Sequence, residues 1–199
     1  MKTNAHGVYL GDPRMDPLWA ELDARGAIAV IHPTAAPGAD ATVFGRPSPM
    51  LEYLFDTTRA IVDLAVSGVF ERFPRIEWVV PHAGAVLPAV VDRVSLFQQI
   101  FGPALTGDRE RLGERVLAEI LPGLWYDLAG TPMPRQARAL ADVAGPERIV
   151  YGSDWCFTPG PLVAQQIAGL DAHWPAAVGG DWRELTTANA RELLERGRR

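Results

Sequence analysis

The sequence predicts an α/β fold built around a parallel β-sheet. Four short apolar runs, rich in Val, Ile, Trp and Tyr and bounded by Gly and Pro, have the composition of buried strands. They are apolar almost throughout, as expected of strands covered on both faces. Helical patterns fill the gaps between them, and strands that alternate with helices form right-handed βα units.

The expected strands are "AIAVIHP" (27–33), "IEWVVPHAG" (76–84), "LWYDLAG" (124–130) and "RIVYGSDW" (148–155). We expect them to be parallel and adjacent in chain order. A complete eight-stranded barrel typically needs about 250 residues. The chain has 199 residues and four clear strands, so it is short for a complete barrel.

Helices are expected over residues 16–26, 49–73, 87–101, 134–145 and 186–199. Asp16 is the expected N-cap of the first, with Pro17 at its first turn and Gly26 beyond its end. Residues 49–73 should form two helices that meet near Gly68. A threonine should open the last helix.

Composition narrows the class of protein. The net charge is −5 and the only basic run is Arg196–Arg199, so nucleic acid is not an expected partner. Cys156 is the only cysteine, which excludes an intrachain disulfide and a cysteine-based zinc site and fits a reducing, cytoplasmic setting. No apolar run is long enough to span a membrane, and the first residues, "MKTNAHGVYLGDP", lack the apolar core of a signal peptide.

A polar residue stands at the C-terminal side of each expected strand: His32, His82, Asp127 and Asp154. In parallel α/β folds this edge of the sheet is where sites are built. Two imidazoles and a carboxylate would suit a divalent metal, zinc or manganese. Each of these residues alone is more often part of a turn, and for Asp127 we favour a hydrogen bond to a neighbouring loop. Their coincidence at matching strand ends favours a site.

The long segment 34–50 follows His32 directly and is rich in Pro and Gly. A lid over the site and a loose insertion are equally expected readings of such a loop. His6 and His173 stand in loop-like contexts and are expected to be solvated.

With these residues placed, the chain resembles the amidohydrolase-related proteins of the decarboxylase branch, which includes aminocarboxymuconate semialdehyde, γ-resorcylate and 6-methylsalicylate decarboxylases. The resemblance rests on "AVIHP", "FDTTRAIVDLAVSGVFERFPRIEWVVPHAGAVLP", "YDLAGTP", "RIVYGSDWCFTP" and "TANARELL", in the family's order. It implies a partial TIM (β/α)8 barrel of the metal-dependent hydrolase type, strands five to eight with their helices, in one domain (1–199).

The resemblance also implies roles. His32 and Asp154 would be metal ligands, and His82 and Asp154 would handle protons. Arg93 matches an arginine that binds a substrate carboxylate, in some members across a dimer interface. Trp155 and Phe157 would line an aromatic pocket. The implied reaction is loss of CO2 from a small aromatic or unsaturated carboxylate, with a divalent metal as cofactor.

The family's first strand carries a His-x-His pair of metal ligands, and this sequence has no His-x-His. Cys156 and Ala85 also depart from the pattern, where proline and a second glycine are common. Two alternatives to a decarboxylase therefore stay open: a metal-dependent hydrolase such as a lactonase, and a non-catalytic remnant. A half barrel would leave two sheet edges and an apolar inner face open, so we expect a homo-oligomer, with a two-fold dimer as the simplest form.

Overall fold

The structure is a computed structural model that describes residues 1–102, 113–130, 132–176 and 178–197. Its main sheet has four strands: β3 (Ile28–Val30), β4 (Glu77–Val80), β5 (Trp125–Asp127) and β6 (Ile149–Val150). They are parallel and pair in chain order, β3-β4-β5-β6. The predicted strands, their direction and their order are confirmed.

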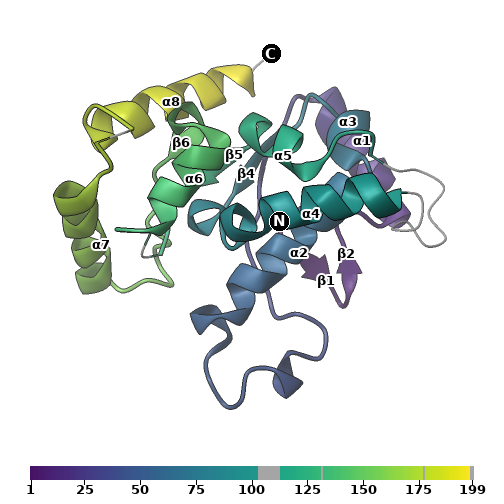
Figure 1. Cartoon of the computed structure of the whole chain (residues 1–199), viewed down its shortest axis with the longest axis horizontal. Coiled ribbons are helices and arrows are strands. Elements are labelled where there is room, and N and C mark those ends of the chain that lie inside the picture. Colours follow the sequence, from purple (N-terminus) through teal and green to yellow (C-terminus); the bar gives the residue numbers. More distant parts are fainter. Residues whose placement is uncertain (103–112, 131, 177, 198–199) are drawn as a thin grey trace.

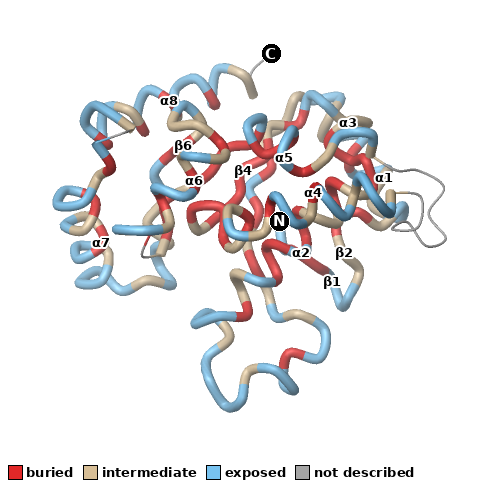
Figure 2. Tube along the Cα trace, in the orientation of Figure 1, coloured by how far each residue is buried: buried red, intermediate tan, exposed pale blue. Residues whose placement is uncertain are grey.

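Helices connect the strands and cover one face of the sheet (Figure 1). Side chains that alternate along each strand face these helices, and they form the main core together with apolar residues of the helices. On β4, Trp78 and Val80 belong to this core, whereas Val79 faces the opposite side. Figure 2 shows burial concentrated along the strands and the inner sides of the helices.

Between β3 and β4 lie α2 (Glu52–Val66) and α3 (Val69–Arg72), which meet at Gly68 as predicted. Gly68 has φ of 67°, a left-handed conformation that glycine adopts without strain. Two elements match the sequence prediction within about two residues: α4 (Leu87–Phe101) and α6 (Gln136–Ala144). The short α5 (Leu117–Ile120) precedes β5.

Two predicted helix caps are wrong. The cap position of α1 (Asp16–Ala24) is Met15, and Asp16 instead accepts a hydrogen bond of 2.6 Å from Arg72 of α3. The last helix, α8 (Trp182–Arg196), begins before the threonines, and the side chain of Asp181 caps it. In α1 the residue predicted as the cap bonds to another helix, and in α8 the acidic residue before the helix takes the capping role. Residues 198 and 199 of the predicted helix lie outside the described residues.

Two elements were not predicted from the sequence: α7 (Gly160–His173) and a small antiparallel hairpin, β1 (Asn4–Ala5) with β2 (Val8–Tyr9). Residues 34–50 form an extended loop with two short 3₁₀ turns, Ala39–Ala41 and Ser48–Met50. This loop projects away from the body of the molecule in Figure 1. None of the described helices has the length and apolarity needed to cross a membrane.

The face of the sheet opposite the connecting helices is partly covered by α8. Leu193 packs with Val79, Trp125 and Val150 in a second apolar cluster. Near the end of α8, Arg196 lies 3.7 Å from Glu77. The expectation of an open apolar inner face is therefore wrong near the N-terminal ends of the strands, because α8 lies across the face there.

The outer edge of β3 is also covered at its C-terminal end. His32 donates from its main-chain nitrogen to the carbonyl of Met1 (2.7 Å), and Thr3 donates to the carbonyl of His32 (3.1 Å), so residues 1–3 run parallel to the end of β3. The expected open edge at the strand that ends in His32 is thus occupied at its C-terminal end by residues 1–3.

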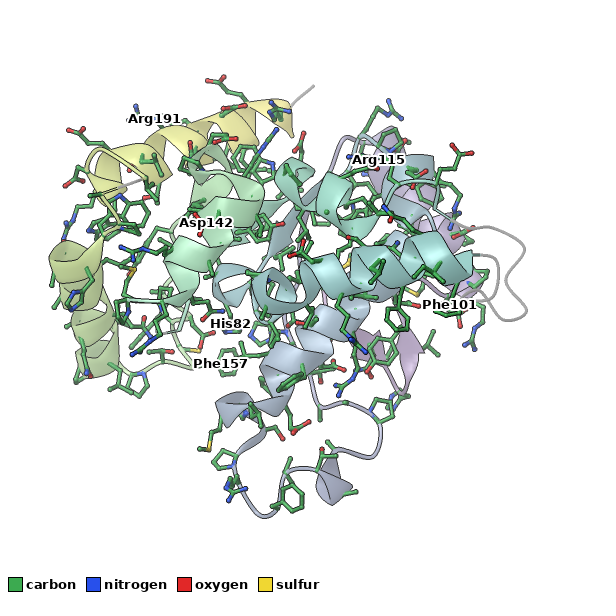
Figure 3. The ribbon with its side chains drawn as sticks, viewed as in Figure 1. His82, Phe101, Arg115, Asp142, Phe157 and Arg191 are labelled. Atoms are coloured by element: carbon green, nitrogen blue, oxygen red, sulfur yellow. The ribbon has the colours of Figure 1, made fainter. Side chains whose placement is uncertain are left out.

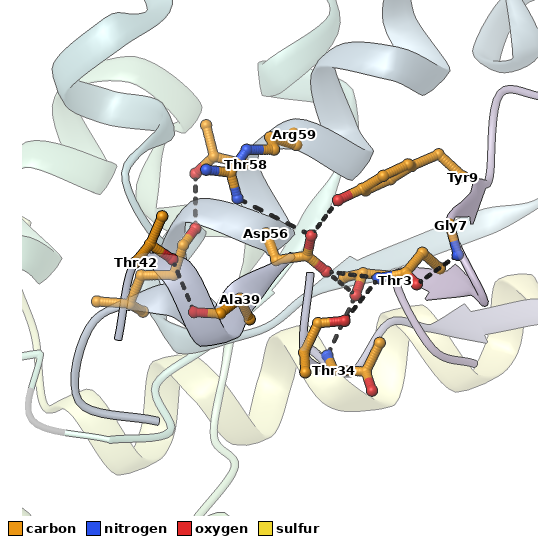
Figure 4. A network of polar contacts seen from close by, with 12 residues as sticks. Thr3, Gly7, Tyr9, Thr34, Ala39, Thr42, Asp56, Thr58 and Arg59 are labelled. Atoms are coloured by element: carbon orange, nitrogen blue, oxygen red, sulfur yellow. Dashed lines mark hydrogen bonds and ion pairs between the residues drawn. The ribbon is translucent and has the colours of Figure 1, made fainter. Parts of the chain in front are cut away.

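A buried carboxylate holds this first segment in place (Figure 4). Asp56 of α2 is fully buried. It accepts hydrogen bonds from the hydroxyls of Thr3 and Tyr9 and from the Asn4 amide, the last at 3.1 Å. Burial and the bond to Asp56 raise the pKa of Tyr9 above its usual range, so its hydroxyl stays a donor.

Candidate functional site

Three of the predicted site residues line one cavity of about 530 Å³ at the C-terminal edge of the sheet. His32 follows β3, His82 follows β4 and Asp154 follows β6. They meet because the strands are parallel and in register, so their carboxyl ends share one edge. Figure 3 shows His82 and Phe157 close to each other at this edge.

His32 and Asp154 lie opposite each other in the cavity. The His32 Nε2 atom is 3.9 Å from Asp154 Oδ1. The other ring nitrogen, Nδ1, is 2.9 Å from the carbonyl of Pro33, which fixes the ring. Thr158 donates to Asp154 Oδ2 at 3.0 Å, leaving Oδ1 directed at the imidazole. Each residue is thus oriented by a neighbour, and the His32 Nε2 atom and the Asp154 Oδ1 atom face each other.

Asp127 holds the main chain at His82 in place through hydrogen bonds. Its Oδ1 accepts hydrogen bonds of 2.9 Å from the main-chain nitrogens of His82 and Ala129. The expected hydrogen bond between Asp127 and a neighbouring loop is thus confirmed, with Asp127 as the acceptor. Burial raises the pKa of Asp127, although the two backbone donors and His82 oppose that shift.

Burial lowers the pKa of His82, against the opposing effect of Asp127 and Asp154. The imidazole is therefore neutral at pH 7, and its protonated form is a stronger acid than a solvated imidazolium. Its Nδ1 is buried and has no hydrogen-bond partner within the described part of the chain.

The turn after β4 is held in a strained conformation. His82 has φ of 57° and Ala83 of 48°, and Asp154 across the cavity has φ of 60°. Side chains other than glycine rarely adopt the left-handed region, and such residues concentrate at functional sites. Gln136 fixes the turn by donating to the carbonyls of His82 (2.6 Å) and Ala85 (2.9 Å).

The donor set only partly fits a metal. His32 Nε2 and Asp154 Oδ1 are near enough to share one cation as neighbouring ligands. In the described ranges, however, no group of three His, Cys, Asp or Glu side chains could hold a metal ion. A complete coordination shell for zinc or manganese needs donors beyond these two.

The remaining predicted residues differ in their positions. Phe157 lines the cavity, with its ring centre 5.5 Å from that of His32. Trp155 does not line it and is 71% exposed. Arg93 lies on α4 with its guanidinium 5.0 Å from the ring centre of Phe97, also outside the lining. Their proposed contacts with substrate remain predictions, and for Arg93 they would require a second chain.

Several residues that line the cavity were not predicted as site residues from the sequence: Lys2, Met50, Tyr53, Gln136 and Thr158. Met50 belongs to the 34–50 loop, which places the end of that loop at the cavity wall. One signal was available for Lys2, since it is the only lysine in the sequence.

Comparison with known proteins agrees with this architecture. The amidohydrolase family profile matches residues 1–196. The 6-methylsalicylic acid decarboxylase of Penicillium expansum is 30% identical over 165 residues, which cover 83% of this chain and 49% of that protein. The chain spans about half the length of the curated relatives it matches.

Solved structures give the same result. A crystal structure of an amidohydrolase II superposes with a TM-score of 0.78 at 30% identity, covering 98% of this chain and 60% of that one. The 5-carboxyvanillate decarboxylase of Novosphingobium aromaticivorans, solved with manganese and a nitrobenzoic acid, gives 0.80 at 19% identity, with 98% and 55% covered. The fold is a partial (β/α)8 barrel, and the chain belongs to the amidohydrolase family.

Proposed function

We propose that this chain carries part of the active site of a metal-dependent decarboxylase that acts on a small aromatic or unsaturated carboxylate. The observation that carries the proposal is the meeting of His32, His82 and Asp154 around one cavity at the C-terminal edge of the sheet. The relatives named as decarboxylases support the reaction class.

The chemistry needs a proton at the ring carbon that bears the carboxylate. The proton forms a C–H bond there, the C–C bond to the carboxylate then breaks, and its electron pair returns to the ring as CO2 leaves. His82 is the proposed residue for moving this proton, because it lines the cavity; once protonated, it gives up the proton more readily than a solvated imidazolium. Phe157 offers an apolar surface for the substrate ring.

A divalent metal, zinc or manganese, belongs to this proposal. His32 and Asp154 would supply two of its ligands. Manganese is present in the related 5-carboxyvanillate decarboxylase. Because the described residues do not complete a metal site, we assign no step of the reaction to the metal.

The test has two arms. The 199-residue chain alone, with 1 mM MnCl2 or ZnCl2, should release little or no CO2 from 6-methylsalicylate, because a loosely held metal cannot position a substrate. A fusion of this chain behind the N-terminal half of the Penicillium expansum relative should release CO2, and His82→Asn and Asp154→Asn in this chain should abolish the release.

Three outcomes would contradict parts of the proposal. Opening of lactones or esters by the fusion without release of CO2 would assign the hydrolase alternative. Release that is unchanged by His82→Asn would remove His82 from the reaction. Robust turnover by the chain alone would show that the missing ligands are dispensable.

We also propose that the chain associates as a homodimer. The outer edge of β6 and the short segment at residues 1–3 are the ends of the described sheet, and α4 exposes several apolar side chains: Leu96, Phe97, Ile100 and Phe101. Sedimentation velocity at micromolar concentration should show a species of twice the chain mass. A stable monomer would refute this. The cytoplasmic location stays a prediction.

A further inference from the structure

We propose that Lys2 binds the carboxylate of the substrate in the candidate active site. This inference rests on the proposed function and deepens it, because it names the group that would select an anionic substrate. Lys2 is the only lysine among 199 residues, and it lies on the wall of the cavity that His32, His82 and Asp154 share.

The pairing of residues 1–3 with the end of β3 sets the direction of the Lys2 side chain. Lys2 is the bridge partner of His32, and paired residues in neighbouring strands point to the same face. The next residue, Thr3, points the other way, since its hydroxyl bonds to Asp56 on α2. Lys2 therefore faces the same side as the imidazole of His32.

The segment that carries Lys2 is held on both sides. Main-chain hydrogen bonds join Met1 and Thr3 to His32. The hydroxyl of Thr3 also accepts a hydrogen bond of 3.2 Å from the main-chain nitrogen of Thr34, so it links the segment to the loop after His32. Lys2 stands on the wall between the candidate site and a second cavity of about 680 Å³, and its flexible stem gives the ammonium reach into the first.

The positive charge of Lys2 makes it the group in this cavity that suits a substrate carboxylate. Of the described side chains that line the cavity, Lys2 is the only Lys or Arg, and Asp154 is the only carboxylate. The Lys2 ammonium makes no hydrogen bond or ion pair within the ranges that the structure describes. An anionic substrate that enters beside Asp154 meets like charge, and a free ammonium offsets it with up to three donors.

The experiment measures binding rather than turnover. Isothermal titration calorimetry would compare 2-hydroxybenzoate with its neutral isostere 2-hydroxybenzamide on the full chain. The variants are Lys2→Met, which keeps a long unbranched side chain, and Lys2→Arg, which keeps the charge. The matched control is Arg191→Met, which removes the same charge from the exposed face of α8, far from His82 in Figure 3.

We expect Lys2→Met to weaken binding of 2-hydroxybenzoate about tenfold, as for loss of one charge-assisted contact in a partly solvated site. Binding of 2-hydroxybenzamide should not change. Lys2→Arg should retain most of the affinity, and Arg191→Met should match the wild type. Raising NaCl to 0.5 M should shrink the difference between Lys2→Met and wild type.

Three results would overturn the inference: undiminished 2-hydroxybenzoate binding by Lys2→Met, equal losses for acid and amide, or no 2-hydroxybenzoate binding by the wild type. The decarboxylase proposal fails separately. Binding that depends on Lys2, with a fusion that releases no CO2, leaves this inference standing and rejects the reaction. Release of CO2 by a fusion that carries Lys2→Met, at unchanged KM, does the reverse.

Discussion

Replacing Asp56 by alanine should destabilise the protein more than most single changes. Asp56 is fully buried and is the common acceptor for Thr3, Asn4 and Tyr9. A hydrogen bond to a charged group contributes about 1.5–3 kcal/mol, and the three are not additive because one carboxylate serves them all. Asp56→Ala leaves three donors without their acceptor, each unsatisfied buried group costs about 1–3 kcal/mol, and we expect a total loss of about 3–5 kcal/mol.

Urea unfolding at pH 7, followed by far-UV circular dichroism, gives the free energy of unfolding for each variant. Tyr9→Phe removes one of the three donors and should cost about 1.5–3 kcal/mol. Asp40→Ala, an exposed carboxylate in the 34–50 loop, is the matched control and should change stability by less than about 0.5 kcal/mol. A loss below about 1 kcal/mol for Asp56→Ala would refute the reasoning, because the donors would then be satisfied without the carboxylate.

Three further outcomes are expected. The folded-state pKa of His82 lies below its unfolded value of about 6.5, so the unfolded chain binds more protons between the two values and stability falls as pH drops through that window. The wild type should therefore lose more free energy of unfolding from pH 7.5 to pH 5 than His82→Asn does. Equal losses would contradict this expectation. Asn189→Ala should lower the free energy of unfolding in urea by about 1–3 kcal/mol, because the buried amide donates to two backbone carbonyls beside β6 at 2.9 and 2.7 Å. The control, Thr187→Ala at an exposed position of the same helix, should be near neutral. Equal losses for the two variants would mean that the amide contacts are unimportant. Ala85→Gly should raise the free energy of unfolding by about 0.5–1 kcal/mol, because Ala85 has φ of 54° and ψ of −122°, a region that only glycine adopts without strain. A lower melting temperature for this variant would contradict the expectation.

The main sheet was predictable because its signals are local. Each strand is a short apolar run, and a parallel order follows from the helix between each pair. The hairpin at Asn4–Tyr9 carried no such signal, because two-residue strands show no alternation. It is stabilised by Asp56, about fifty positions away in the sequence. The helix at 160–173 was missed because apolar side chains such as Leu162, which is 50% exposed, spread around it instead of marking one face.

The site residues also differ in whether local sequence signals could predict them. His32, His82 and Asp154 share an edge because each directly follows a strand, which sequence shows. The side to which Lys2 points depends on its pairing with His32, thirty residues away, and on the bond from Thr3 to Asp56. The match of Arg93 to a carboxylate-binding arginine did not place its side chain either, because it does not say which side of α4 carries the guanidinium.

The position of α8 has a consequence for the order of folding. Each strand pairs with its neighbour in the chain, so the sheet forms by closing loops of roughly fifty residues or fewer. The end of α8 instead packs against β3, the first strand of the main sheet: a Cβ at Gly197 would lie 2.8 Å from Ile28 Cδ1. Docking the end of this helix against β3 joins segments from the two ends of the chain, and the helix needs the sheet as its surface. We therefore expect α8 to dock last and to open first, so that its amides exchange with solvent before those of β4 and β5 in native-state hydrogen exchange.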